Sequence, residues 1–261
     1  HVRAYDLIHS STVERTGPFA SHPLSVGIAH NMIDFMPERP LHPMDTLLAV
    51  LVNRFYNWAW VDAIRGKSQR FGVPFLIPGA PQVPEALNRV TADYMGLNYY
   101  TKGYLRFRPP TVTANTSADV PIGLTFAKRK EPMSDLGWAI HPKGMRKLLR
   151  KLHSRLGLPI YITENGIADG EDLLRGVYLF THLQEIARAL SEGIEILGYY
   201  HWSLLDNFEW IKGFKPRFGL LRVDYDTMAR QKTGSADLYA KIIRSHAGVD
   251  LQRPSPEYFG I

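Results

Sequence analysis

Two segments carry the residues best suited to chemistry. Glu164 lies in a Thr-Glu-Asn-Gly segment directly after the apolar run at residues 158–162, so its carboxylate is predicted where a β-strand ends. Residues 202–210, Trp-Ser-Leu-Leu-Asp-Asn-Phe-Glu-Trp, combine indole rings with further carboxylates. This combination favours chemistry on a sugar, because a carboxylate can form the covalent intermediate while flat rings and two-oxygen acceptors hold the sugar. The second carboxylate that such chemistry needs is not evident in the sequence.

The elements that position these residues are predicted by the hydrophobic pattern. Short apolar runs rich in β-branched and aromatic residues predict strands, and amphipathic stretches between them predict helices. The strands are expected at residues 24–29, 94–100, 160–163 and 196–202. The helices are expected at residues 2–9, 45–65, 142–156, 172–192 and 233–246. Alternation of apolar strands with helices predicts an α/β fold with a parallel sheet covered by helices.

Local signals support this assignment. Pro142 suits the first turn of a helix, and Gly193 suits the position just past a helix end. Long connections are expected at residues 67–92 and 101–137, and the alternating pattern at residues 104–108 in the second predicts one arm of a hairpin.

Four strand–helix units are half of an eight-stranded (β/α)8 TIM barrel, here its strands 5–8. An isolated half would leave its first and last strands with unpaired edges. We therefore expect residues 1–261 to be the C-terminal part of a single barrel domain whose N-terminal part precedes this chain. Functional residues of such a barrel lie at the C-terminal ends of its strands, where this sequence has Asn98, Tyr100, Glu164 and Trp202.

Composition limits the remaining classes of protein. The 261 residues are 45% hydrophobic and 21% charged, which is typical of a globular chain, and no segment resembles a membrane span or a leader peptide. The absence of cysteine excludes disulfides and thiolate metal sites and is typical of a reducing compartment such as the cytoplasm. The net charge of +6 raises the question of nucleic acid, but the densest basic run lies on the predicted helix 142–156, opposite its leucines. We therefore expect a solvated helix face, no nucleic-acid or membrane partner, and no metal or other cofactor.

Several motifs, in this order along the chain, resemble glycoside hydrolase family 1, the retaining β-glucosidase family. They span nearly the whole sequence, and the two segments described first are the most specific. The matching segments are residues 96–101 (Gly-Leu-Asn-Tyr-Tyr-Thr), 135–138 (Asp-Leu-Gly-Trp) with Pro142, 161–166, 172–175 with Tyr178 and His182, 198–210, 217–219 and 223–225.

The resemblance implies two catalytic residues in this chain. Glu164 resembles the nucleophile, which would attack the anomeric carbon and form a glycosyl-enzyme that water hydrolyses. Tyr100 resembles the phenol that donates a hydrogen bond to this carboxylate and stabilises it. Taken alone, Glu164 could instead cap a helix or pair with a surface base, and Tyr100 could be a core aromatic residue.

The resemblance also implies six sugar-binding residues. Glu209 resembles the acceptor for two adjacent hydroxyls at the far edge of the sugar, although its spacing also permits a role as the missing acid. Trp202 and Trp210, with Phe218, resemble the pocket walls, and Trp138 resembles the platform for the leaving group. Asn98 resembles a polar neighbour of the reacting sugar or, equally, a structural residue at the start of a loop. His201 is expected to point away from Trp202 as a hydrogen-bonded core histidine, outside the site.

The sequence also departs from the family pattern. Phosphosugar-specific relatives are expected to have serine at position 209, so Glu209 argues against a phosphate pocket. The segment at residues 230–235 differs from the usual one, which affects a loop contact and not the chemistry. The family's general acid/base is a glutamate in an Asn-Glu-Pro setting, and neither Glu38 nor Glu131 fits this pattern.

The predicted function is therefore that of a β-glycosidase acting on terminal non-reducing β-D-glycosyl residues. The partners implied are a β-glycoside or oligosaccharide substrate and the N-terminal half of the same barrel, covalently joined or as a separate chain, which would supply the acid/base. The alternative is a remnant of such a barrel that binds carbohydrate or a partner without catalysis.

Overall fold

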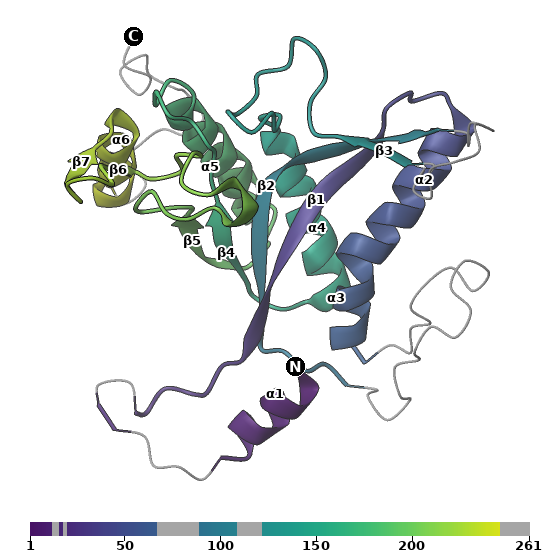
Figure 1. Cartoon of the computed structure of the whole chain (residues 1–261). Helices are drawn as coiled ribbons and strands as arrows, with labels where there is room; N and C mark the ends of the chain where they lie inside the picture. The colour runs from purple at the N-terminus through teal and green to yellow at the C-terminus, as the bar shows by residue number, and fades with distance from the viewer. Residues whose placement is uncertain (12–15, 18–19, 67–88, 109–121, 246–261) are drawn as a thin grey trace.

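A computed structural model describes residues 1–11, 16–17, 20–66, 89–108 and 122–245. Its centre is a parallel sheet in the order β1-β2-β4-β5, with β3 antiparallel to β2, and α2, α4 and α5 lie along this sheet (Figure 1). The strands are β1 Gly27–Pro37, β2 Tyr94–Phe107, β3 Ile122–Thr125, β4 Ile160–Asn165 and β5 Ile196–His201, followed by the hairpin β6 Leu221–Val223 and β7 Arg230–Lys232. The helices are α1 Val2–His9, α2 Pro43–Asn53, α3 Ala59–Ile64, α4 Pro142–Leu156, α5 Arg175–Ser191 and α6 Gly234–Arg244.

The four predicted parallel strands are all present, but the first two are longer than expected. β1 spans Gly27–Pro37 and not residues 24–29, and it tolerates Asp34 because this buried carboxylate is paired with Lys147 Nζ at 2.6 Å and lies 3.2 Å from His141 Nε2. β2 continues to Phe107, so the connection predicted at residues 101–137 begins inside this strand. The hairpin arm is confirmed, since Tyr104–Phe107 pairs with β3.

The helix predicted at residues 45–65 is interrupted. A π-helical turn, Arg54–Trp58, separates α2 from α3. The side chain of Asn57 binds both the backbone N–H and the carbonyl of Ile33 on β1, and Asn53 Oδ1 accepts from Asn57 and from Trp58 Nε1. The bonds from Asn57 to β1 stabilise a π-helical turn in place of regular α-helix. The hydrophobic periodicity of the sequence does not predict such bonds. Residues 67–88 and 109–121 of the two predicted connections, and residue 246 of the last predicted helix, lie outside the described residues.

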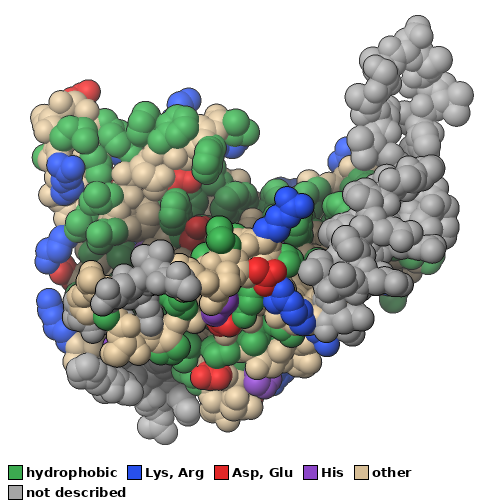
Figure 2. All heavy atoms as spheres, turned by 90° about the horizontal axis from the view of Figure 1, so that it is seen from below, with side chains coloured by type: hydrophobic (Ala, Val, Ile, Leu, Met, Phe, Trp, Pro, Cys, Tyr) green, Lys and Arg blue, Asp and Glu red, His purple; other side chains and the backbone are tan. Residues whose placement is uncertain are grey.

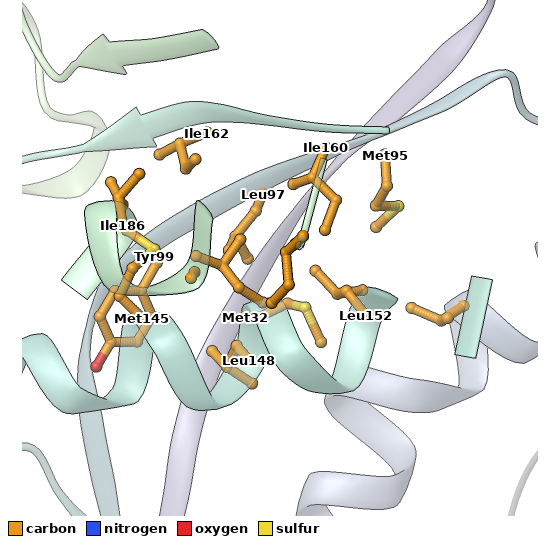
Figure 3. Close-up of a cluster of buried hydrophobic side chains, with 14 of the residues drawn as sticks. Met32, Met95, Leu97, Tyr99, Met145, Leu148, Leu152, Ile160, Ile162 and Ile186 are labelled. Atoms are coloured by element: carbon orange, nitrogen blue, oxygen red, sulfur yellow. The ribbon is translucent and has the colours of Figure 1, made fainter. Parts of the chain in front are cut away.

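The main core lies between the sheet and the helices α4 and α5. Met32, Leu97, Leu148, Leu152 and Ile162 are among its members, each at most 2% exposed, and they interdigitate across the layers (Figure 3). Burial of such side chains stabilises the fold by about 1.5–3 kcal/mol each. Pro142 begins α4, and Gly193 with a φ of 83° follows α5, as the sequence predicted.

The basic face of α4 is solvated, as expected. Arg150, whose side chain is 55% exposed, pairs with Glu192, while Leu148, Leu149 and Leu152 on the other face are buried. Within the described part of the chain, no helix has the length and apolarity needed to cross a membrane.

Candidate active site

The centre of the site joins the ends of two neighbouring strands. Glu164 on β4 lies in register with Asn98 on β2, and two residues further along β2 the hydroxyl of Tyr100 donates a short hydrogen bond to Glu164 Oε2. Burial, together with this contact to the carboxylate, raises the pKa of the Tyr100 phenol. The phenol therefore remains protonated and available as a donor to Glu164 across the neutral range.

A second carboxylate lies close to this centre. Trp202, directly after β5, donates from Nε1 to Glu209 Oε1 at 3.3 Å, and both side chains are half-buried. Burial raises the pKa of Glu209 and the bond from Trp202 opposes that change, while the charge of Glu164 raises it further. Glu209 therefore lies near enough to Glu164 for their charges to interact.

Aromatic rings pack around Tyr100, the residue that binds Glu164. The Tyr100 ring makes edge contacts with Trp138 at 5.8 Å and with Phe218 at 6.2 Å between ring centroids. Trp138 and Phe218 lie 6.3 Å apart, and Phe126 lies 6.2 Å from Trp138. Phe218 is only 2% exposed and packs against Tyr100, so its assignment to a pocket wall stays a prediction.

The other predicted site residues are placed differently. Asn98 Oδ1 accepts from Thr163 Oγ1 at 2.5 Å, which directs the amide toward β4 and the position of Glu164. Trp210 lies on the 3₁₀ turn Trp210–Lys212 and is 79% exposed, away from the Tyr100, Trp138 and Phe218 cluster. Its assignment to a pocket wall stays a prediction.

The expectation of a hydrogen-bonded His201 is wrong. Both ring nitrogens are buried and have no hydrogen-bond partner among the described residues. Burial lowers the pKa of His201 to about 3, so the ring is neutral. The alternation of β5 places this residue away from Trp202 as predicted, but the sequence carries no signal for the missing partner.

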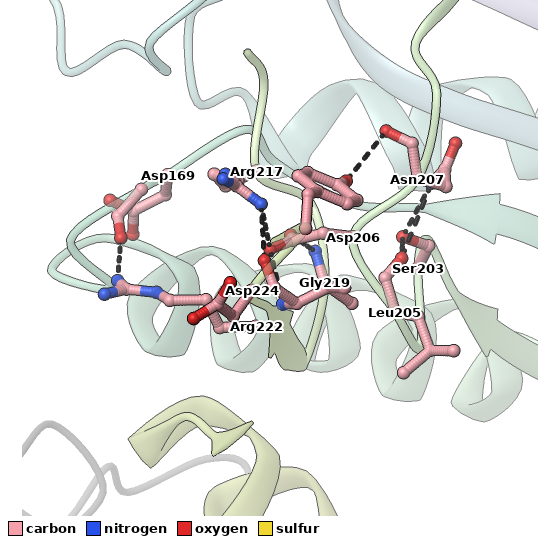
Figure 4. A network of polar contacts seen from close by, with 12 residues as sticks. Asp169, Ser203, Leu205, Asp206, Asn207, Arg217, Gly219, Arg222 and Asp224 are labelled. Atoms are coloured by element: carbon pink, nitrogen blue, oxygen red, sulfur yellow. Dashed lines mark hydrogen bonds and ion pairs between the residues drawn. The ribbon is translucent and has the colours of Figure 1, made fainter. Parts of the chain in front are cut away.

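Sequence reasoning missed the carboxylate that organises the loop around Phe218. Asp206, 5% exposed, accepts from the backbone N–H groups of Gly219 at 2.9 Å and Val223 at 3.1 Å, and from Arg217 Nη1 at 3.1 Å (Figure 4). Arg217 also donates to the carbonyl of Val223 at 2.9 Å. A lone aspartate between Leu205 and Asn207 was the available signal, because an acidic residue in a folded apolar segment requires buried donors.

The close approach of β4 and β5 was also missed. Gly166 lies two residues after Glu164, and a Cβ atom there would collide with the carbonyl oxygen of Trp202. Glycine is therefore required so that the strand end bearing Glu164 can pass beside the strand end bearing Trp202.

Comparison with known proteins places this chain in a family. Residues 48–248 match the sequence model described as Glycosyl hydrolase family 1. The chain is 36% identical over 248 residues to a beta-galactosidase of Sulfolobus acidocaldarius, covering 94% of this chain and 46% of that protein. It is 33% identical to a beta-galactosidase of Pyrococcus woesei, covering 94% of this chain and 49% of that protein. The chain thus spans about half the length of these relatives.

Solved structures agree with the sequence match. A beta-glycosidase from Pyrococcus horikoshii superposes with a TM-score of 0.72 at 34% identity, covering 85% of this chain and 48% of that one. A family 1 β-glucosidase from Thermotoga maritima gives a TM-score of 0.75 at 27% identity, covering 94% of this chain and 54% of that one. The parallel sheet and helices of this chain thus match about half of each of these solved glycosidases. The chain belongs to glycosyl hydrolase family 1.

Proposed function

We propose that this chain carries the nucleophile and the sugar-edge recognition of a retaining β-glycosidase that removes terminal non-reducing β-D-glycosyl residues. The observation that carries the proposal is the hydrogen bond from Tyr100 to Glu164 at the ends of adjacent parallel strands. It gives a carboxylate with a fixed orientation, and the Trp202–Glu209 pair beside it offers an indole face and an acceptor for hydroxyls. Family membership and the names of the relatives support the same reaction class.

The proposed reaction has two steps at one carbon. A carboxylate oxygen of Glu164 bonds to the anomeric carbon as the glycosidic C–O bond breaks, and a general acid protonates the departing oxygen. Water then attacks the same carbon, the ester bond to Glu164 breaks, and the conjugate base of the general acid takes the proton from water. Tyr100 would donate to the carboxylate as it leaves, which stabilises the returning negative charge.

The general acid/base is proposed to come from the N-terminal half of the barrel, as a covalent or separate-chain partner. The chain covers 46% and 49% of two relatives, which is consistent with half of their barrel. Among the described strands, β1 pairs only with β2 and β5 only with β4, so both have an edge available for further strands. The cytoplasmic location expected from the cysteine-free sequence stays a prediction.

Exposed apolar side chains are consistent with contact to the proposed N-terminal half of the barrel. Leu47, Val50 and Phe55, from α2 and the π-helical turn, are 49%, 57% and 55% exposed, and Leu197 and Tyr200 on the edge strand β5 are 50% and 57% exposed. Figure 2 shows hydrophobic side chains gathered over part of the face seen from below. Exposed apolar side chains on such edge elements are typical of an interaction surface.

The test compares Glu164→Gln with Glu195→Gln in the natural protein that contains this chain. Glu195 is an exposed glutamate at the opposite end of the neighbouring strand β5, so it matches the substitution without touching the site. With activated aryl β-glucoside, β-galactoside and β-fucoside as substrates, Glu164→Gln is expected to lower kcat by roughly 10⁴-fold or more, while Glu195→Gln stays near the native rate. The substrate panel also identifies the preferred sugar.

A second measurement identifies the covalent step. An activated 2-deoxy-2-fluoro-β-glycoside slows hydrolysis of the glycosyl-enzyme, so the label is expected on the peptide containing Glu164 by mass spectrometry. Undiminished turnover by Glu164→Gln would falsify the assignment. Sugar binding without turnover or labelling by the native protein would instead support the non-catalytic alternative.

A further inference from the structure

We propose that Asn165 and Tyr178 are positioning residues that hold Tyr100, Glu164 and Trp202 in register for the reaction. The inference rests on the proposed function of Glu164, and it assigns a role to two buried residues that do not face the sugar. Together they form a hub, defined here as the Asn165 amide, the Tyr178 hydroxyl and the groups that these two side chains bind.

Asn165 is the first component of the hub. It directly follows Glu164 and is fully buried, at 0% exposure. Its Nδ2 donates to the carbonyl of Tyr99 on β2 at 2.7 Å and to the hydroxyl of Tyr178 at 2.8 Å, and its Oδ1 accepts from the Tyr199 hydroxyl of β5 at 2.9 Å. Both amide donors are used, so the amide has one orientation.

Tyr178 is the second component. Its ring is 1% exposed on α5 and stacks on His182 at 3.9 Å between centroids. Its hydroxyl accepts from Asn165 and donates to the backbone carbonyl of Tyr100 at 3.0 Å. Burial raises the pKa of the Tyr178 phenol, so it stays a donor to that carbonyl. The Tyr178 hydroxyl therefore fixes the backbone of Tyr100, whose side chain binds Glu164.

The third strand is joined through the backbone of the same asparagine. The N–H of Trp202 donates to the carbonyl of Asn165 at 2.9 Å, so the hub residue Asn165 and the residue after β5 are fixed together. One buried asparagine thus links the strand ends that carry Tyr100, Glu164 and Trp202.

The hub lies where the pairing of β4 with its neighbouring strands shifts register. The pairing of β2 with β4 shifts register between Leu97 and Asn98, and the pairing of β4 with β5 shifts between Ile162 and Asn165. Glu164 therefore lies next to register shifts on both sides of β4, where the regular ladder alone does not fix its distance from Tyr100. The side-chain bonds of Asn165 and Tyr178 add fixed contacts at these shifts, and a shift of about 1 Å at a reacting group can reduce a rate by roughly 100-fold.

The decisive variant is Tyr178→Phe, with Tyr239→Phe as its matched control. Both remove one tyrosine hydroxyl that donates to a strand carbonyl, since Tyr239 donates to the carbonyl of Tyr199 at 3.3 Å, but only Tyr178 binds beside the reacting residues. We expect Tyr178→Phe to lower kcat and the rate of labelling of Glu164 by the fluoroglycoside by roughly 10- to 100-fold, with KM changed by less than about threefold. Tyr239→Phe should label within about twofold of the native rate.

These measurements separate positioning from general stability and from the proposed function. Labelling rates are compared at a temperature where circular dichroism shows each variant fully folded. A folded Tyr178→Phe that labels within about twofold of the native rate, or no more slowly than Tyr239→Phe, overturns the inference while leaving the nucleophile assignment intact. If Tyr178→Phe is not recovered folded, Asn165→Ser removes the same contact from the other side, and native labelling by that variant overturns it equally. A native protein that is never labelled at Glu164 overturns the proposed function and the inference together.

Discussion

The stability of the loop that carries Phe218 depends on one buried carboxylate, and Asp206→Ala tests this dependence. Asp206 accepts from the backbone N–H groups of Gly219 and Val223 at 2.9 and 3.1 Å, and both of these bonds are buried. Removing the carboxylate leaves two buried donors without an acceptor, at about 1–3 kcal/mol each. The third bond, from Arg217, is discounted because that side chain is 31% exposed and water can replace its partner. The free energy of unfolding is therefore expected to fall by about 2–6 kcal/mol.

Asp224, in the turn between β6 and β7, provides the matched control. It also accepts from two backbone N–H groups, those of Asp226 at 2.9 Å and Thr227 at 3.1 Å, but these contacts are exposed to water. Asp224→Ala should barely change the urea midpoint, because water satisfies both donors. Unfolding in urea, followed by circular dichroism and tryptophan fluorescence, measures both variants. The reasoning is refuted if Asp206→Ala costs no more than Asp224→Ala.

The strands and the strand-end residues were predictable because they depend on local pattern. Apolar β-branched runs predicted four parallel strands, and the rule that functional residues follow strand ends brought Tyr100 and Glu164 together before their hydrogen bond was observed. The catalytic roles themselves stay predictions. What the pattern missed depends on contacts distant in sequence: β1 tolerates Asp34 because this buried carboxylate pairs with Lys147, 113 positions along the chain.

The supporting residues were missed for a related physical reason. Asn165 and Asp206 have side chains typical of turns, and their neighbours in the sequence do not reveal which buried groups each of them binds. His201 shows the opposite case, in which a buried polar ring has no partner among the described residues. Burial and partners of single polar residues are set by tertiary packing, so a periodic pattern indicates the face that a residue occupies and not what it binds.

Two further predictions concern the Tyr100 bond and acid stability. Tyr100→Phe should lower kcat by roughly 10- to 100-fold and make glycosyl-enzyme accumulate in steady-state mass spectra, because the departing Glu164 carboxylate loses a charge-assisted donor; an unchanged kcat contradicts this. His182 donates from Nδ1 to the carbonyl of Tyr178 at 2.7 Å, its buried Nε2 has no partner among the described residues, and burial lowers its pKa from 6.5 to about 3. Between about pH 3 and 6.5 the folded protein therefore binds fewer protons than the unfolded one. The contribution of the neutral His182 to the free energy of unfolding is fully present above about pH 6.5. It is lost as the pH falls toward 3, by up to about 1.4 kcal/mol per pH unit. In His182→Leu the free energy of unfolding should therefore fall less steeply between about pH 6.5 and 3. The control is His153→Leu, at an exposed position of α4. Equal slopes in the two variants would show that the buried ring does not titrate on unfolding.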